Sequence, residues 1–504
     1  MSANLYDLFL SRAPRRDKLA LEAEGGLSLS YGELFARAGR AAQALIDCGV
    51  EPGDRVAVQI DKSPDAIVLT LACLKAGAAL LPLNPAYTLA ELEYFLDDSA
   101  PALTICRPSA LAAVRELAAK LGLKAVESLG AAREGTFAER IDATSAEAPT
   151  VKRASDDLAA ILYTSGTTGR SKGAMLTHEN LASNALALVD LWRFTESDVL
   201  IHALPVFHTH GLFVASNVAL LSGATMIFQP RFDADAIIAA LPRASALMGV
   251  PTFYTRLVEH PGLTREAIAR MRVFVSGSAP LLAETHRLWR ERTGHAILER
   301  YGMTETNMIA SNPYDGERRP GAVGFALPGV SLRVADPESG APLAEGEVGV
   351  VEVKGPNVFK GYWRMPEKTA SEFRPDGFFI TGDLGRFDAE RYLNIVGRAK
   401  DLVISGGFNV YPKEIESEID AIDGVIESAV IGVPHPDLGE GVTAIVVARE
   451  GASLDEAAII AVLEGRLAKY KLPKRVVFVD DLPRNAMGKV QKATLREAYK
   501  ALYA

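Results

Sequence analysis

The sequence predicts an α/β protein with a large N-terminal body and a small C-terminal domain. Over roughly the first 320 residues, short apolar runs alternate with helical patterns, which favours helices layered on largely parallel sheets. Glycines and strand-like segments then become frequent and predict a smaller β-rich subdomain. The last stretch reads as a compact α+β unit, so the predicted domains span residues 1–398 and 399–504.

The predicted strands of the body are continuous apolar runs, the pattern of strands buried on both faces of a sheet. They cover residues 55–60, 158–165, 246–252 and 272–278. Residues 176–192 repeat apolar side chains at helical spacing, which predicts a helix. Thr177 stands directly before the main apolar positions of that pattern and is expected to cap the helix.

The C-terminal unit combines helical and strand patterns. Residues 413–422 place isoleucines on one face of a predicted helix. Ser453 and Glu456 have the spacing of a capping box, so a helix is expected to begin there and to run to Leu467. Predicted strands cover 428–434, 441–450 and 476–480.

Composition excludes several classes of function. The 504 residues include 54 Lys and Arg against 63 Asp and Glu, a net charge of −9, and 48% of them are hydrophobic. A chain of this length and composition can bury a large core without disulfides, so a disordered or disulfide-stapled protein is excluded. Because nucleic acid demands a positive face, the acidic balance argues against nucleic acid as a partner.

The sequence favours a cytoplasmic setting. The three cysteines, Cys48, Cys73 and Cys106, are typical of a reducing compartment and argue against a zinc site. The N-terminal apolar stretch is short and contains Asp7, so a signal peptide is not expected. Residues 211–228 lack ionisable side chains, but polar residues interrupt them. A buried helix, a turn and a strand are expected there instead of a membrane span.

The strongest local signal is the segment 163–173, Tyr-Thr-Ser-Gly-Thr-Thr-Gly-Arg-Ser-Lys-Gly. It directly follows an apolar strand, and its glycines allow the backbone to approach an anion closely. Backbone N–H groups, hydroxyls and the ammonium of Lys172 are groups that cradle phosphate oxygens. The spacing differs from that of a P-loop, and a flexible polar loop is the alternative interpretation.

Three further segments carry candidate binding groups. Glu305 stands among hydroxyl side chains, and Mg²⁺ prefers one or two carboxylates plus substrate phosphates; a solvated helix residue is the alternative. Asp383 lies in a predicted tight turn, where a carboxylate can bind a ribose diol or can simply shape the turn. Lys489 follows a glycine in a loop, and spacing alone does not distinguish it from a solvated lysine.

Together these segments resemble the signatures of the acyl-adenylate-forming superfamily, which includes acyl-CoA synthetases, 4-coumarate ligases and luciferases. The resemblance spans essentially the whole chain in the family's order. It consists of segment 163–173, Tyr-Gly-Met-Thr-Glu at 301–305, Thr-Gly-Asp at 381–383 and Pro-x4-Gly-Lys ending at Lys489. It implies a body of stacked α/β sheets with a β-barrel-like part, and a mobile C-terminal α+β domain hinged near Lys400.

The resemblance also implies a reaction in two steps. A carboxylate attacks the α-phosphate of ATP and forms an acyl-adenylate and pyrophosphate; the thiol of CoA then attacks the acyl carbon and releases AMP. Positioned cations suit this chemistry because charge builds up on the phosphoryl oxygens. Lys489 would act in adenylation only and would leave the site when the C-terminal domain rotates.

The same resemblance gives each candidate residue an expected role. The catalytic residues would be Lys489, Glu305 and Thr304, with Glu305 also at Mg²⁺. ATP would contact Thr164, Ser165, Gly166, Thr167, Thr168, Gly169, Lys172, Tyr301, Gly302, Asp383 and Arg398. CoA would contact His208, Gly406 and Gly407. A lysine acetyltransferase acting on Lys489 is an expected partner, and the chain is expected to be a monomer or a homodimer.

The resemblance places the acid near segments 207–211 and 249–256. Arg256 is the informative residue there, because a buried guanidinium needs an anion and its planar fork matches a second carboxylate. A solvated helix arginine is the alternative. The wider pattern looks most like that of malonyl-CoA synthetases, so a small polar pocket is expected. Its walls would be Thr209, His210, Ser278, Met303 and Met308.

Malonate is therefore the expected acid, with methylmalonate left open. One alternative is a CoA ligase for another short, medium-chain or aryl acid. Another is an adenylation enzyme that serves a carrier protein in trans, since 15 residues follow Lys489. A nucleotide-binding regulator without activity would be expected to lack Lys489 or Glu305, and both are present.

Overall fold

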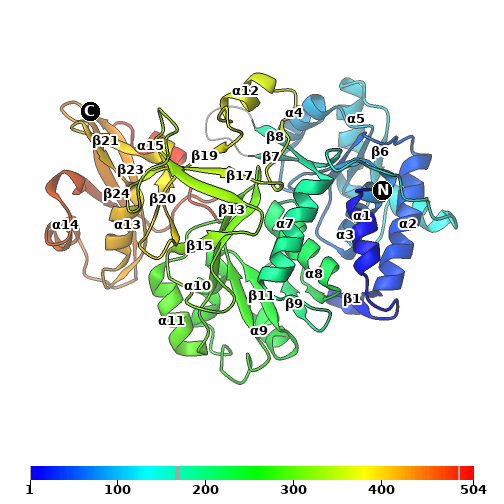
Figure 1. Cartoon of the computed structure of the whole chain (residues 1–504), viewed down its shortest axis with the longest axis horizontal. Coiled ribbons are helices and arrows are strands. Elements are labelled where there is room, and N and C mark those ends of the chain that lie inside the picture. Colours follow the sequence, from blue (N-terminus) through cyan, green and yellow to red (C-terminus); the bar gives the residue numbers. More distant parts are fainter. Residues whose placement is uncertain (1, 165–170, 486–487, 504) are drawn as a thin grey trace.

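The computed structural model describes residues 2–164, 171–485 and 488–503. It has the predicted α/β class, with a large N-terminal body and a small C-terminal domain. In Figure 1 the body fills the centre and right, and the C-terminal domain, coloured orange to red, lies at the left.

The first sheet of the body carries the glycine-rich segment at one edge. Its order is β18 (Gly361–Tyr362), β8 (Lys172–Thr177), β7 (Leu158–Thr164), β4 (Ala79–Pro82), β3 (Arg55–Gln59), β5 (Leu103–Cys106) and β6 (Val126–Ser128). Strands β7, β4, β3, β5 and β6 are parallel, whereas β8 runs antiparallel to β7 and pairs Lys172 with Thr164. Both ends of the segment that the sequence singles out therefore lie side by side.

The second sheet is continuous over thirteen strands. Its order is β16 (Ser331–Ala335), β17 (Gly349–Lys354), β19 (Phe379–Phe387), β20 (Leu393–Arg398), β15 (Ala322–Ala326), β14 (Asn307–Ser311), β13 (Leu298–Met303), β12 (Val273–Ser276), β11 (Ala246–Gly249), β9 (Val199–His202), β10 (Thr225–Phe228), β1 (Leu19–Ala23) and β2 (Ser28–Ser30). Strands β13 to β1 pair in parallel, and β14 to β16 extend the sheet with antiparallel pairs. The predicted β-rich subdomain is this antiparallel extension.

Helices cover the sheets and bury the large aromatic side chains Trp192 and Trp289. They are α1 (Leu5–Arg12), α2 (Tyr31–Asp47), α3 (Pro64–Ala76), α4 (Leu89–Ser99), α5 (Leu111–Lys120), α6 (Thr136–Ala143), α7 (His178–Leu191), α8 (Asn217–Ser222), α9 (Ala234–Ala240), α10 (Pro251–Glu259), α11 (Ala283–Thr293) and α12 (Pro366–Ser371). The cap predicted for α7 is confirmed, because Thr177 accepts a hydrogen bond from the Asn180 backbone N–H.

The apolar residues 211–228 fold as the sequence predicts. They form most of a π-helix, η3 (His210–Ser216), then α8, a left-handed turn at Gly223 and strand β10. A wide helical turn of this kind is uncommon and often marks a functional site. Within the described residues, no helix is long and apolar enough to cross a membrane.

The C-terminal domain has its own sheet, ordered β22 (Phe408–Val410), β21 (Val403–Ser405), β24 (Gly439–Ala448) and β23 (Val425–His435), with β25 (Arg475–Phe478) beside β24. Its helices are α13 (Pro412–Asp420), α14 (Glu456–Glu464) and α15 (Lys492–Tyr499). Alternate residues of β23 and β24 belong to two apolar clusters, one on each face of the sheet. The short helical turn 399–401 joins this domain to β20.

The capping box predicted at Ser453 and Glu456 was wrong. Asp455 caps α14 instead, because its carboxylate accepts from the Ala458 N–H. The Glu456 carboxylate accepts from the backbone N–H of Val476 on β25, a tertiary contact that the local spacing does not encode. The helix also ends at Glu464, before the predicted Leu467.

Candidate active site

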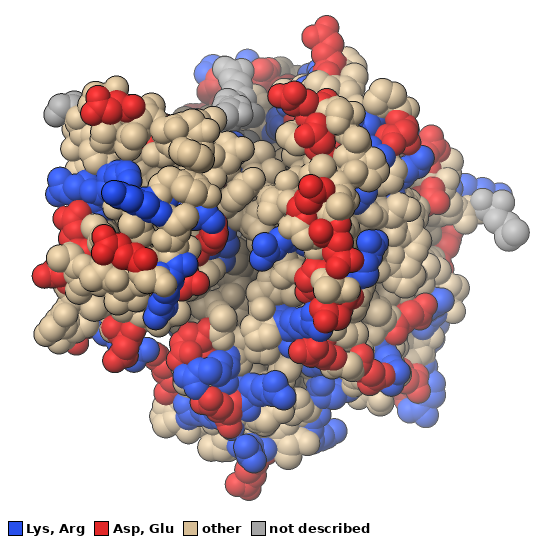
Figure 2. Space-filling view, turned by 60° about the vertical axis from the view of Figure 1, so that its left-hand side comes forward, with Lys and Arg blue, Asp and Glu red and all other residues tan. Residues whose placement is uncertain are grey.

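A cavity of about 310 Å³ lies between the body and the C-terminal domain. On the body's side it is lined by residues at the carboxyl ends of the parallel strands β11, β12 and β13, the edge where open α/β sheets commonly bind ligands. The C-terminal domain closes it with α13 and with the loop that carries Lys489. Figure 2 shows the molecule hollowed between two masses, with basic and acidic side chains interspersed over this face.

Asp383 and Arg398 face each other on the paired strands β19 and β20 and line this cavity. Arg398 Nε lies 2.9 Å from Asp383 Oδ1, and the Tyr301 hydroxyl donates to Asp383 Oδ2 at 2.5 Å. Only 4% of Asp383 is exposed, and its negative charge raises the pKa of Arg398. The two donors hold the carboxylate in one orientation, in which it can accept hydrogen bonds from a diol.

Glu305 is buried beside the end of the glycine-rich segment. The Tyr362 hydroxyl donates to Glu305 Oε1 at 3.0 Å, and Lys172 Nζ lies 4.4 Å from the centroid of the Tyr362 ring. Burial raises the pKa of Glu305, while the positive charges of Arg398 and Lys172 oppose the rise. The half-buried Thr304 directly precedes it. A divalent cation and a phosphate group would meet complementary charges here.

Only the ends of the glycine-rich segment belong to the described chain. Thr164 closes β7, and its hydroxyl donates to the backbone carbonyl of Lys172 at 3.5 Å. The other predicted ATP ligands in this segment, Ser165, Gly166, Thr167, Thr168 and Gly169, lie outside the described residues.

Lys489 enters the same cavity from the C-terminal domain. Its N–H donates to Asn485 Oδ1 at 3.0 Å, and the Asn485 N–H donates back to the Lys489 carbonyl at 3.0 Å. Burial and the positive charge of Arg398 lower the pKa of Lys489, while Asp383 is among the carboxylates that oppose this shift. The structure therefore brings Lys489 into one cavity with Tyr301, Gly302, Asp383 and Arg398, whereas Lys172, Thr304 and Glu305 are not part of its lining.

Arg300 is a site residue that the sequence analysis missed. It lies on β13 directly before Tyr301, lines the cavity and is 4% exposed. Its Nε and Nη2 atoms are buried without a hydrogen-bond partner in the described part of the chain, and burial lowers its pKa to about 9. Because an unpaired buried cation is costly, this end of the cavity is suited to an anion.

Ser278 lines the same cavity as Arg300, whereas the predicted pocket residues His210 and Thr209 do not. Gly277 gives the guanidinium its room, since a Cβ there would lie 2.4 Å from Arg300 Cζ. Ser278 has a left-handed backbone with φ of 75°, an uncommon conformation for a residue with a side chain, and its hydroxyl lies 3.2 Å from His210 Nδ1. Burial and the charge of Arg300 keep the pKa of His210 well below its usual range. Thr209, also buried, precedes His210.

The predicted burial of Arg256 was wrong. Arg256 lies on α10, is exposed, and places its guanidinium 5.6 Å from the centroid of the Phe232 ring. Thr252 and Thr255 of the same helix line the cavity, but Arg256 does not. The helix turns this position outward, so the requirement of a buried guanidinium for an anion applies to Arg300 instead.

Met303 and Met308 do not close the pocket as expected. Both pack against the apolar core of the body, and neither lines the cavity.

The predicted CoA contact His208 is partly buried, its ring lies 4.5 Å from that of Phe207, and burial lowers its pKa to about 4.

The remaining predicted residues lie on the C-terminal domain or at its link to the body. Gly406 and Gly407 form the two-residue turn of the β21–β22 hairpin, with φ of 58° and 82°, values that favour glycine. Lys400 lies in the turn 399–401. Desolvation, reinforced by the charge of Arg398, lowers the pKa of Lys400 to about 8.

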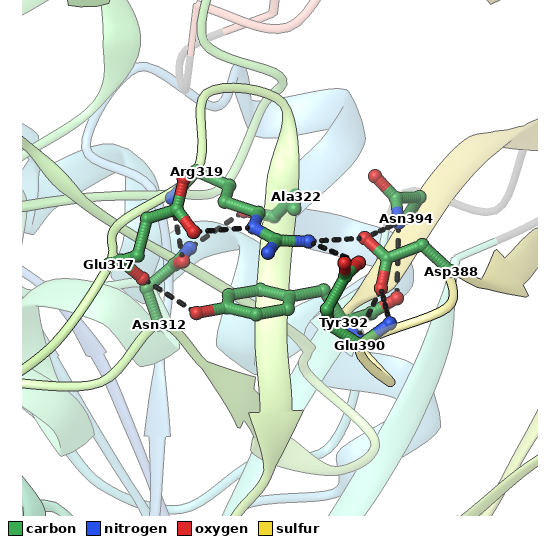
Figure 3. Close-up of polar contacts among 8 residues, drawn as sticks. All are labelled: Asn312, Glu317, Arg319, Ala322, Asp388, Glu390, Tyr392 and Asn394. Atoms are coloured by element: carbon green, nitrogen blue, oxygen red, sulfur yellow. Dashed lines mark hydrogen bonds and ion pairs between the residues drawn. The ribbon is translucent and has the colours of Figure 1, made fainter.

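A polar network around Arg319 fixes two walls of the cavity relative to each other (Figure 3). The loop after β14 carries Arg319 and leads to Gly321, and the β19–β20 hairpin carries Asp383. Arg319 lies over the Tyr392 ring, 4.2 Å from its centroid, and its nitrogens lie within 3.1 Å of three carboxylates. These belong to Glu317, Asp388 and Glu390. The network thus ties the loop to the turn of the hairpin.

Glu299 is a second buried ionisable group at the cavity. It is 6% exposed, and its Oε1 accepts from the Gly321 N–H at 2.9 Å. Burial raises its pKa to about 8, against the weaker effect of Lys413 on the C-terminal domain. Ionising the buried Glu299 carboxyl therefore lowers the stability of the folded protein.

Comparison with known proteins identifies the class to which this fold and cavity belong. The chain matches AMP-binding enzymes over residues 10–363 and the C-terminal domain of these enzymes over residues 414–489. It therefore belongs to the AMP-binding enzyme family, and its fold is that of the acyl-CoA synthetases, as predicted.

Individual relatives act on different acids. The chain is 37% identical over 479 residues to a feruloyl-CoA synthase of Streptomyces sp, covering 94% of this chain and 95% of the relative. It is 36% identical over 527 residues to a mitochondrial malonate–CoA ligase of Mus musculus, covering 97% and 89%. ATP-bound MatB from Rhodopseudomonas palustris is 62% identical over 100% of both chains, with a TM-score of 0.98. Apo MatB, also 62% identical over 100% of both chains, gives a TM-score of 0.87.

Proposed function

We propose that this chain is an ATP-dependent malonate–CoA ligase. Malonate and ATP would form malonyl-adenylate and pyrophosphate, and the thiol of CoA would then displace AMP to give malonyl-CoA. The observation that carries the proposal is Arg300, a buried guanidinium without a counter-ion in the described part of the cavity wall. The malonate–CoA ligases among the relatives support the same substrate.

The pocket around Arg300 suits a short dicarboxylate. One carboxylate would accept two parallel hydrogen bonds from the guanidinium, leaving the other to attack the α-phosphate. Ser278 and the neutral His210 would add hydrogen bonds beside it. An aryl acid, as the feruloyl-CoA synthase relative would suggest, would leave Arg300 buried without an anion. Methylmalonate keeps both carboxylates and remains a second candidate substrate.

In the same proposal, the other signatures bind the nucleotide. Asp383, held by Tyr301 and Arg398, would accept hydrogen bonds from the ribose hydroxyls. Lys172 and the segment that begins at Thr164 would hold the β- and γ-phosphates. Lys489 would stabilise the charge that develops on the phosphoryl oxygens during adenylation.

The residues around Glu305 fit Mg²⁺. A buried carboxylate whose pKa is raised by burial regains a partner when a cation binds, and Mg²⁺ commonly takes one or two carboxylates with substrate phosphates. Glu305 would hold the ion with Thr304 nearby, while Tyr362 would keep the carboxylate oriented. When bound, the ion would neutralise charge on the phosphates of ATP.

We also propose that the domains divide at residues 398 and 399 and that the C-terminal domain rotates about Lys400. The orientation described here would be the one for adenylation, since Lys489 lies among the charges of Arg398 and Asp383. The higher TM-score to ATP-bound than to apo MatB supports this assignment. Rotation would withdraw Lys489 and open the path of CoA to His208 and the turn 406–407.

The proposal also covers the location, oligomeric state and modification of the protein. A cytoplasmic location agrees with the scarcity of cysteine, and either a monomer or a homodimer could act. A lysine acetyltransferase that modifies Lys489 would remove its charge and thereby stop adenylation.

The experiment that tests the substrate is pyrophosphate release across a panel of acids, with and without CoA. We expect malonate to give the highest kcat/KM, methylmalonate to follow, and propionate, butyrate and ferulate to be far poorer. A higher kcat/KM for ferulate or butyrate than for malonate would overturn the assignment.

A further inference from the structure

We infer that Lys62 and His202 are positioning residues for the acid pocket, because they hold the π-helical turn η3, whose His210 lies against Ser278 of the cavity wall. The inference rests on the proposed function, since it concerns how the proposed acid site keeps its shape. Neither residue lines the cavity, and neither has a role in the mechanism proposed above.

Lys62 and His202 join the two sheets of the body. Lys62 follows β3 of the first sheet, and His202 is the last residue of β9 in the second. Lys62 Nζ lies 3.0 Å from His202 Nδ1, donates to the His202 carbonyl at 2.7 Å, and lies 4.3 Å from the centroid of the Phe228 ring. One lysine side chain thus holds both the ring and the backbone of His202.

The hydrogen-bond partners of His202 determine which of its ring nitrogens carries the proton. A backbone carbonyl only accepts, so Nε2, which faces the Gly211 carbonyl, carries the ring proton and Nδ1 accepts from Lys62. Nε2 lies 2.9 Å from the Gly211 carbonyl and 3.1 Å from the Ser216 hydroxyl. Complete burial and the charge of Lys62 keep the pKa of His202 well below its usual range, so the ring stays neutral.

The two groups that Nε2 of His202 contacts, on Gly211 and Ser216, lie near the start and at the end of the π-turn. Ser216 Oγ donates to the Gly211 carbonyl at 2.9 Å, so this carbonyl has donors from both side chains. Gly211 also packs closely against the preceding chain, since a Cβ there would lie 2.1 Å from the Pro205 carbonyl oxygen. His202 therefore stabilises a wide turn that is uncommon by itself.

The turn reaches the acid pocket through Ser278, which lines the cavity. His210 precedes Gly211, and its Nδ1 lies 3.2 Å from the Ser278 hydroxyl. If the turn lost the donor from His202, it would relax and move His210 away from Ser278 and Arg300. A displacement of about 1 Å in such a site can cost on the order of a hundredfold in rate.

The test compares Lys62→Met with Lys75→Met in the pyrophosphate-release assay. Methionine keeps an unbranched stem over Phe228 but removes the donor to His202. Lys75 is the matched control, because its ammonium also lies over an aromatic ring, 4.6 Å from the Tyr6 centroid, and it does not line the cavity. We expect Lys62→Met to raise the KM for malonate about tenfold or more, with the KM for ATP changed less than about twofold. Lys75→Met should leave both values unchanged.

A second pair of variants keeps the test decisive where Lys62→Met yields little folded protein. His202→Gln keeps an amide donor near the position of Nε2, whereas His202→Asn does not reach it. The KM for malonate should therefore rise more in His202→Asn than in His202→Gln. Changes below about twofold in both, or equal rises of the KM for malonate and ATP, would overturn the positioning role. If the wild type favours another acid, the proposed substrate fails and the same comparison is made with that acid.

Discussion

Replacing Arg300 by alanine should remove the preference for malonate while leaving the nucleotide site intact. The side chain is 4% exposed, two of its nitrogens lack a partner in the described residues, and the proposed second carboxylate would satisfy them. Truncating one partner of a desolvated, hydrogen-bonded charge pair costs about 2–5 kcal/mol. At about 1.4 kcal/mol per tenfold, kcat/KM for malonate should fall by about 30-fold to several thousand-fold.

The assay compares malonate with propionate, which has the same reacting carboxylate but lacks the second one. Propionate loses no ion pair in Arg300→Ala, so its weak activity should persist or improve. Arg300→Lys should restore malonate activity only in part, because an ammonium does not reproduce the planar fork. The KM for ATP should change little, since Asp383 and Arg398 are untouched.

Arg256→Ala is the matched control, because Arg256 is exposed and lies outside the cavity lining. It should lower malonate activity by less than about threefold, as exposed substitutions usually do. A parallel fall of malonate and propionate in Arg300→Ala would refute the reasoning, as would a larger loss in Arg256→Ala. Thermal unfolding adds a check: Arg300→Ala should not be destabilised in proportion to its lost activity, because it also removes an unpaired buried cation.

Three further predictions concern the charges and the hinge around the cavity. Lys489→Ala should reduce malonyl-adenylate formation by at least about a hundredfold yet largely spare thioester formation from supplied malonyl-adenylate; equal losses in the two half-reactions would contradict its role. Lys400→Pro should leave adenylation nearly normal and slow thioester formation at least about tenfold, because proline fixes φ at the proposed pivot; equal slowing of both would refute the hinge. Glu299→Gln should raise Tm by about 2 °C or more at pH 9 and have little effect at pH 5. The reason is that burial raises the pKa of Glu299 from 4.5 to about 8, so stability is lost as pH rises from about 4.5 to about 8, and glutamine removes that loss. A Tm gain that is independent of pH would count against this explanation.

The sequence predicts best what depends on neighbouring residues. The strands and the Thr177 cap follow from local periodicity and from a side chain three residues from its donor. The cap of α14 was misassigned because Ser453 and Asp455 both offer an oxygen near the helix start, and only the contact of Glu456 with β25 separates them. Tertiary structure decides such cases.

The acid pocket illustrates the same limit. On α10, sequence order places Arg256 beside cavity residues, but the helix turns its side chain outward. In a helix of nine residues, the apolar pattern alone does not determine which side chains face the cavity. Arg300 had a signal that could have revealed it, because two charged residues, Glu299 and Arg300, follow the apolar Ile297 and Leu298 into a buried strand. Buried charges in a strand are rare enough to mark a site.

The central claim is that this chain activates malonate through a malonyl-adenylate, and single-turnover analysis of the reaction tests it most directly. Excess enzyme is mixed with malonate and ATP without CoA, quenched, and analysed by mass spectrometry, with CoA added to a second portion before the quench. The account predicts that malonyl-AMP accumulates with an equal amount of pyrophosphate, and that CoA converts it to malonyl-CoA and AMP. Absence of malonyl-AMP from an enzyme that forms the adenylate of ferulate or butyrate under the same conditions would contradict it.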